Sequence, residues 1–168
     1  MIKKYFLLNA LFILSVTSYS EPLDPVKLLS NYVGIDTVNP PGNESRAVDF
    51  YAKIFEEEGI EFSSAESAPG RGNIWARIKG GDLPALILLQ HTDVVPATKK
   101  YWDTDPFVAE IKDGYLYGRG VIDMKGAGIS QLVSFIRLHR SGLSLNRDVV
   151  FVATADEEAG GMFGAGWL

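Results

Sequence analysis

The residues best suited to chemistry in this sequence are one histidine and four carboxylates, placed after apolar stretches. Two of them follow the apolar run 85–89, and two follow the apolar run 149–153. The chain contains no cysteine, so a metal ion could be held only by imidazole nitrogen and carboxylate oxygen, which are ordinary zinc ligands. The candidate site residues are His91, Asp93, Asp123, Glu157 and Glu158.

His91 and Asp93 are two positions apart in a segment expected to be extended, so their side chains would share one face. A histidine that binds a metal usually donates its other ring N–H to an oxygen acceptor, and Asp93 is close enough in sequence to serve. The alternative interpretation is a histidine that is simply hydrogen-bonded at a strand end.

Asp123 lies among glycines ahead of a predicted helix, where it could cap the helix or bridge two cations. Glu157 and Glu158 are adjacent, so their charges repel unless a positive charge is near. They could start a helix or end a solvated loop. In the functional interpretation, one binds a metal and the other is a general base that takes a proton from water.

The elements that must position these residues follow from hydrophobic patterning. Continuous apolar runs such as 85–89 and 149–153 are typical of strands buried on both faces of an α/β sheet, and ligands bind beyond the carboxyl ends of such strands. A strand is expected at 73–79, and a short one at 115–117. Three helices are expected. The first spans 26–32, the second begins after Asn43 as its cap, and the third ends just before Gly142. The buried faces of the last two helices comprise Ala47, Tyr51, Ile54 and Phe55, and Ile129, Leu132, Val133 and Ile136.

Composition narrows the class of protein. The 168 residues suit one domain, and 46% of them are hydrophobic, enough for a sizeable core. The net charge is −5 with no basic block, which argues against a nucleic-acid partner. His139, the second of two histidines, belongs to the last turn of a predicted helix, where it favours the helix dipole.

The first 20 residues have the pattern of a cleavable signal peptide. Two lysines precede a mostly apolar run, and small residues follow it, which predicts cleavage after Ser20. The run is too short for a spanning helix, which needs about 20 apolar residues. We therefore expect a secreted or periplasmic protein without a stable membrane span after cleavage.

Four segments, taken together, resemble the family of dinuclear-zinc exopeptidases and deacylases. That family includes acetylornithine deacetylase, succinyl-diaminopimelate desuccinylase, glutamate carboxypeptidase and aminoacylase. The segments are HTDVVP (91–96), WDTDPF (102–107), GRGVIDMKG (118–126) and ATADEEAGG (153–161). The resemblance implies an α/β, phosphorylase/hydrolase-like zinc-exopeptidase catalytic domain, with a mainly parallel central sheet flanked by helices.

The resemblance also implies a role for each candidate residue. His91 would bind one zinc ion, Glu158 would bind the other, and Asp123 would bridge the two. Asp93 would orient His91 or the site, and Glu157 would be the general base. Zn²⁺ is the implied cofactor, two ions per complete site, with Co²⁺ able to replace it. A cis peptide bond after the bridging aspartate is implied as well.

Family members carry a further carboxylate ligand and a second histidine ligand after the paired glutamates, whereas this sequence stops at Leu168. We therefore expect residues 21–168 to be the N-terminal part of a C-terminally truncated catalytic domain, without the dimerisation or lid domain. Each zinc ion would lack a ligand, so the chain alone is expected to bind zinc poorly and to be inactive.

The implied function is zinc-dependent hydrolysis of amide bonds, as an exopeptidase or an N-acyl amino acid deacylase. The substrate would be a small peptide or an N-acyl amino acid, and full-length relatives often dimerise. The alternatives are an inactive truncated fragment, a non-catalytic binding module that retains the half-fold, and a hydrolase that uses a single metal ion.

Overall fold

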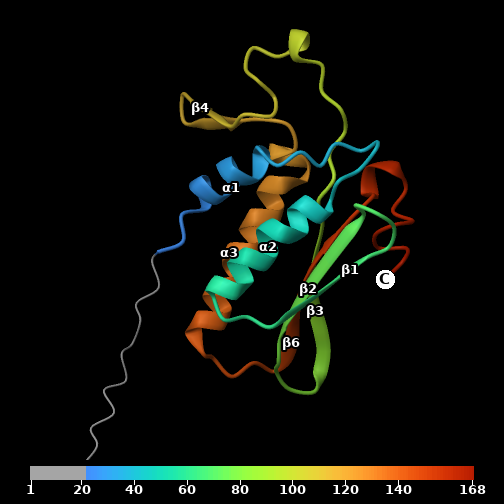
Figure 1. Cartoon of the computed structure of the whole chain (residues 1–168). Helices are drawn as coiled ribbons and strands as arrows, with labels where there is room; N and C mark the ends of the chain where they lie inside the picture. Colours follow the sequence, from blue (N-terminus) through green and yellow to red (C-terminus); the bar gives the residue numbers. More distant parts are fainter. Residues whose placement is uncertain (1–21) are drawn as a thin grey trace, which may run out of the picture.

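In the computed structural model, which describes residues 22–168, helices lie against a four-stranded β-sheet (Figure 1). The predicted signal segment, 1–20, lies outside the described residues. Within residues 22–168, no helix is long and apolar enough to cross a membrane.

The sheet has the strand order β1-β2-β6-β3, with β1 at Phe62–Glu66, β2 at Gly72–Ile78, β6 at Arg147–Thr154 and β3 at Leu83–His91. Strands β3 and β6 are parallel, whereas the β1–β2 and β2–β6 pairs are antiparallel. The predicted α/β fold with flanking helices is confirmed, but its sheet is mixed rather than mainly parallel. The short connections from β1 to β2 and from β2 to β3 explain this difference, because a parallel pair needs a long crossover.

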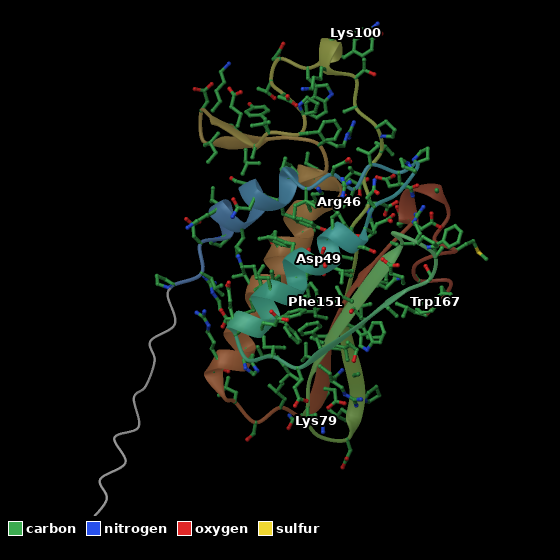
Figure 2. All side chains as sticks on the ribbon, viewed as in Figure 1. Arg46, Asp49, Lys79, Lys100, Phe151 and Trp167 are labelled. Atoms are coloured by element: carbon green, nitrogen blue, oxygen red, sulfur yellow. The ribbon has the colours of Figure 1, made fainter. Side chains whose placement is uncertain are left out.

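Three α-helices are described, α1 at Pro25–Val33, α2 at Ser45–Glu57 and α3 at Gly126–Ser141. The predicted buried faces of α2 and α3 are confirmed, and they enclose an aromatic core around Phe151 of β6. The ring of Phe151 contacts the rings of Tyr51 and Phe55 of α2 and Phe135 of α3, on the helix side of the sheet (Figure 2). The cap of α2 is Glu44 rather than Asn43, and its carboxylate is engaged elsewhere.

Strand β3 differs from the sequence-based expectation. Leu86, Ile87 and Leu89 are 48%, 59% and 49% exposed, so burial of the run 85–89 on both faces is wrong for this strand. The reason is position, because β3 is an edge strand of the described sheet and the helices lie on one face (Figure 1). In β6, an inner strand, buried and half-buried residues alternate.

The chain between β3 and α3 forms a projecting region. It contains the short 3-10 helix η1 at Lys99–Tyr101 and a hairpin of β4 at Glu110–Lys112 and β5 at Tyr115–Tyr117. Figure 2 places Lys100 at the tip of this region and Lys79 at the opposite end of the sheet. After the hairpin, the chain passes through a kinked turn, η2 at Val121–Lys125, in which Asp123 and Met124 have non-helical backbone angles, and it then enters α3.

Candidate metal centre

Strand direction brings the candidate residues to one edge of the sheet. Because β3 and β6 are parallel, their carboxyl ends lie together, and His91 pairs in register with Thr154. Glu157 and Glu158 follow in the short 3-10 helix η3, Glu157–Ala159. Strand β2 runs the other way, so its first residue, Gly72, lies at the same edge.

Three potential metal ligands meet at this edge. One ligand atom each from His91, Asp123 and Glu158 lies within 4.8 Å of the other two. His91 Nε2 lies 3.0 Å from Asp123 Oδ1. One imidazole nitrogen and two carboxylate oxygens are a donor set that suits Zn²⁺, so the residues present fit the implied metal. Glu157 lies beside them, with Oε2 3.7 Å from His91 Nε2.

Asp123 reaches the centre because the segment around it is fixed from both sides. On one side, the guanidinium of Arg119 lies 5.3 Å from the ring centre of Trp102 in the projecting region. On the other side, the buried Lys125 donates hydrogen bonds to the carbonyls of Tyr32 and Ile35. The peptide bond after Asp123 is cis, as the resemblance implied. The Asp123 side chain itself remains 71% exposed.

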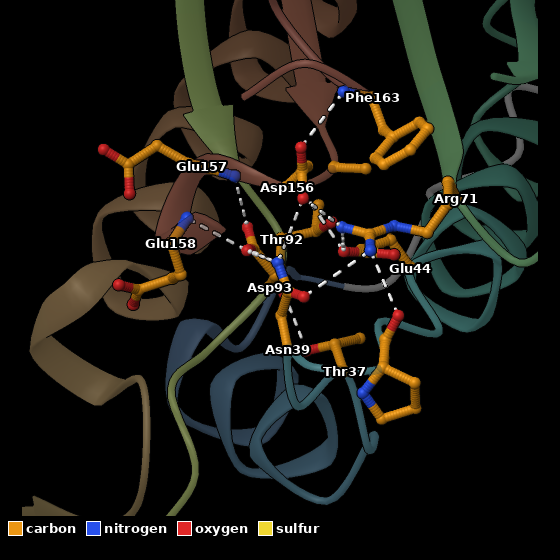
Figure 3. Close-up of polar contacts among 12 residues, drawn as sticks. Thr37, Asn39, Glu44, Arg71, Thr92, Asp93, Asp156, Glu157, Glu158 and Phe163 are labelled. Carbon is orange, nitrogen blue, oxygen red and sulfur yellow. Dashed lines mark hydrogen bonds and ion pairs between the residues drawn. The ribbon is translucent and has the colours of Figure 1, made fainter. Parts of the chain in front are cut away.

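Asp93 is fully buried and binds the backbone of both glutamates. Its two carboxylate oxygens accept hydrogen bonds from the N–H groups of Glu157, at 3.1 Å, and Glu158, at 3.0 Å. Figure 3 shows those backbone nitrogens facing Asp93 while the glutamate side chains point away. His91 Nδ1 lies 3.1 Å from the Asp93 carbonyl oxygen and 3.4 Å from Oδ1. Asp93 therefore contacts three of the four other predicted site residues.

The electrostatics of the site favour a cation. Burial raises the pKa of Glu158, and the charge of Asp123 raises it further. Burial alone would lower the pKa of His91, but hydrogen bonds with Asp93 and Asp123 outweigh it and raise that pKa to about 9. The charge of Asp123 contributes to the rise of the Glu158 pKa, and its hydrogen bond contributes to the rise of the His91 pKa.

Sequence reasoning missed a second, deeper group of polar residues. It comprises Asn39, Glu44, Arg71 and Asp156, all buried. Arg71 Nη2 lies 2.9 Å from Glu44 Oε1 and 2.7 Å from Asp156 Oδ1. Asn39 Nδ2 donates to Asp93 Oδ2 at 2.8 Å and lies 3.3 Å from Asp156 Oδ1 (Figure 3). No local pattern marks this group, because its contacts join distant positions, such as Arg71 and Asp156, which are 85 residues apart.

Residues 87–168 match the sequence model of the family described as Peptidase family M20/M25/M40. This segment belongs to that family. It contains all five predicted site residues, and it begins inside β3.

Individual M20 relatives agree with the family match. The chain is 35% identical to human aminoacylase-1 over 139 residues, covering 81% of this chain and 34% of that protein. It is 36% identical to succinyl-diaminopimelate desuccinylase of Parvibaculum lavamentivorans over 148 residues, covering 84% and 36%. The chain thus spans about a third of the length of the curated relatives it matches.

A solved structure supports the same relationship. The crystal structure of human carnosine dipeptidase 1 superposes with a TM-score of 0.60 at 28% identity, covering 83% of this chain and 33% of that one. The predicted family resemblance is therefore confirmed, and it extends to the fold.

Proposed function

We propose that this chain contributes the metal site and the general base of a zinc-dependent amide hydrolase. The substrate class is a small peptide or an N-acyl amino acid, in keeping with the relatives named as aminoacylase, desuccinylase and dipeptidase. The observation that supports the proposal most directly is the meeting of His91, Asp123 and Glu158, with Glu157 alongside.

The metal ligands in this proposal are His91, Asp123 and Glu158. A catalytic zinc site commonly has three protein ligands and one open position, which matches the number of ligand atoms gathered here. Two separate ions would leave each with two of these ligands, so the geometry favours one ion on this chain. Asp123 lies in the chain segment between β3, which carries His91, and η3, which carries Glu158. It is the residue suited to join this ion to a second one where further ligands are supplied.

Glu157 is the proposed general base. Its carboxylate is 62% exposed, so water and substrate can reach it, and its backbone is fixed through Asp93. The chemistry that a bound zinc ion supplies is Lewis-acid polarisation of the amide carbonyl. Glu157 accepts a proton from the attacking water and then passes it to the nitrogen of the leaving amine.

The proposal is tested by Glu157→Ala in the zinc-loaded protein, assayed with dipeptides and N-acyl amino acids. We expect turnover to fall about 10²- to 10⁴-fold, the usual contribution of a general base, while zinc binding stays within about twofold of wild type. The matched control is Glu57→Ala, which removes a glutamate at the end of α2.

Wild-type turnover in the Glu157→Ala protein would overturn the assignment of the base. A wild-type chain that binds zinc but hydrolyses none of these substrates would favour one of the inactive alternatives, the truncated fragment or the non-catalytic binding module. Two tightly held zinc ions per chain would contradict the arrangement with one ion.

A further inference from the structure

The buried polar group beneath the metal centre forms a continuous chain of contacts that starts at Arg71. Its guanidinium contacts Asp156, Asn39 contacts Asp156, and the same Asn39 amide donates to Asp93. Asp93 in turn holds the backbone N–H groups of Glu157 and Glu158. Arg71 is therefore connected, through the three buried side chains of Asp156, Asn39 and Asp93, to the residues that carry the proposed ligand and base.

The setting of Arg71 is specific for a guanidinium. One terminal nitrogen lies between Glu44 and Asp156, while the other donates to the carbonyl of Pro41 at 3.0 Å. The guanidinium carbon also lies 5.2 Å from the ring centre of Phe163. A Cβ at Gly42 would come within 2.5 Å of that carbon, so the absence of a side chain there makes the space. A lysine has a single charged nitrogen and cannot reproduce this fork.

Asp156 is the residue through which Arg71 acts on the backbone. Its φ is 71°, a left-handed conformation that turns the chain between β6 and η3. Arg71 binds Oδ1, and the N–H of Phe163 donates to Oδ2 at 3.1 Å. This turn is what directs the next two backbone N–H groups toward Asp93 rather than along β6.

The charges of the buried acids also make Arg71 necessary. Glu44, Asp93 and Asp156 are each at most 4% exposed at their side chains, and Arg71 is the arginine that contacts two of them. Buried carboxylates without a cationic partner are costly, so Glu44 and Asp156 depend on Arg71. Asp93 instead lies beside His91 and accepts hydrogen bonds from Asn39 and from two backbone N–H groups. Because Arg71 supplies the positive charge of this buried group, the proposed ligands His91, Asp123 and Glu158 remain free to attract a metal.

We propose that Arg71 is a positioning residue for the metal centre, which sets the orientation of Glu157 and Glu158 through Asp156, Asn39 and Asp93. This inference rests on the proposed function for its catalytic meaning, but the orientation itself can be measured without a metal. It assigns Arg71 no contact with substrate or with the reacting atoms.

The test compares Arg71→Lys with Arg77→Lys in the full chain. Arg77 lies on β2, which begins directly after Arg71, and it pairs with Asp148 in a more exposed setting, so it is the matched control. Amide hydrogen exchange is read residue by residue in the metal-free protein. We expect the amides of Glu157 and Glu158 to exchange about tenfold faster or more in Arg71→Lys, with those of α3 unchanged, and no such change in Arg77→Lys.

Cobalt binding gives the second measurement, on the same three proteins. Removing a group that orients a metal ligand typically weakens binding about 10- to 100-fold, and we expect a loss of that size in Arg71→Lys together with an altered visible spectrum of the bound Co²⁺. If Arg71→Lys does not fold, Asn39→Ser breaks the same chain of contacts without removing a buried charge and is expected to give the same selective result.

The outcomes separate the inference from the proposed function. Unchanged exchange at Glu157 and Glu158 overturns the inference, as does a uniform increase across the protein, which would make Arg71 a general stabiliser. Selective exchange in a chain whose wild type binds no Co²⁺ supports the positioning role and overturns the proposed metal site.

Discussion

Six acidic side chains near the carboxyl edge of the sheet form two groups with opposite surroundings. The inner group, Glu44, Asp93 and Asp156, is buried, and each member accepts hydrogen bonds or pairs with Arg71. The outer group, Asp123, Glu157 and Glu158, is more exposed, and its side chains face one another around His91. The inner carboxylates are occupied by hydrogen bonds and ion pairs within the protein, whereas the outer ones remain able to bind a metal ion.

This difference shows how side chains with the same carboxylate group acquire different roles. A carboxylate whose oxygens are occupied by backbone N–H groups is a structural part of the site, as Asp93 is. A carboxylate whose oxygens face solvent and a histidine is available for a cation, as Asp123 is. If this division is correct, substitutions in the two groups must affect different quantities.

The largest effect is expected for Asp93→Ala. This change leaves the N–H groups of Glu157 and Glu158 and the amide of Asn39 without their acceptor in a buried place. Breaking a buried charged interaction typically costs about 3–5 kcal/mol, so we expect the free energy of unfolding to fall by that amount. Urea denaturation of the metal-free protein measures it. A loss no larger than that of Asp123→Ala would erase the distinction between the groups.

Asp123→Ala should show the reverse pattern. Because its side chain is largely exposed, we expect the free energy of unfolding to change by less than about 0.5 kcal/mol. Zinc or cobalt affinity should fall about 100-fold, which corresponds to about 2.7 kcal/mol. Equilibrium metal titration measures this loss. Affinity retained in Asp123→Ala would show that the outer group does not hold the ion.

The smallest effect is expected for Glu44, a member of the inner group, and it concerns how stability depends on pH. Burial raises the pKa of Glu44, although hydrogen bonds and Arg71 oppose the shift. Its protonation therefore adds to stability as the pH falls through the range just above its ordinary pKa, and this contribution is lost as the pH rises. We expect Glu44→Gln to gain stability relative to wild type as the pH is raised from 4.5 to 7. Urea denaturation across that range measures the trend, and a relative loss with rising pH would contradict it.

Much of the fold was predictable from periodicity. The helical spacing of Ala47, Tyr51 and Ile54 fixes the inner face of α2, and the two apolar runs mark β3 and β6. Local patterns fail where strand pairing decides. Strand β1 is weakly apolar and was not predicted, and the exposure of Ile87 depends on which strand lies beside it.

The candidate site divides in the same way. The sequence indicated the outer residues, because His91 and the paired glutamates follow apolar runs whose ends a parallel pair of strands must bring together. It did not indicate Arg71, because the arginine contacts Asp156 85 positions away, and no local pattern reports such a contact. The proposed metal-binding residues lie in recognisable motifs, whereas the buried residues that position them are recognisable only from tertiary contacts.

The pairing of β3 with β6 also has a consequence for the order of folding. Thr92 contacts Thr154 across 62 positions of sequence, whereas β1 and β2 are joined by a short turn. Contacts between distant positions must close a long loop of chain before they stabilise anything, so they form slowly. We therefore expect the helices and the β1–β2 hairpin to form early, and the metal centre to be among the last parts of the chain to assemble.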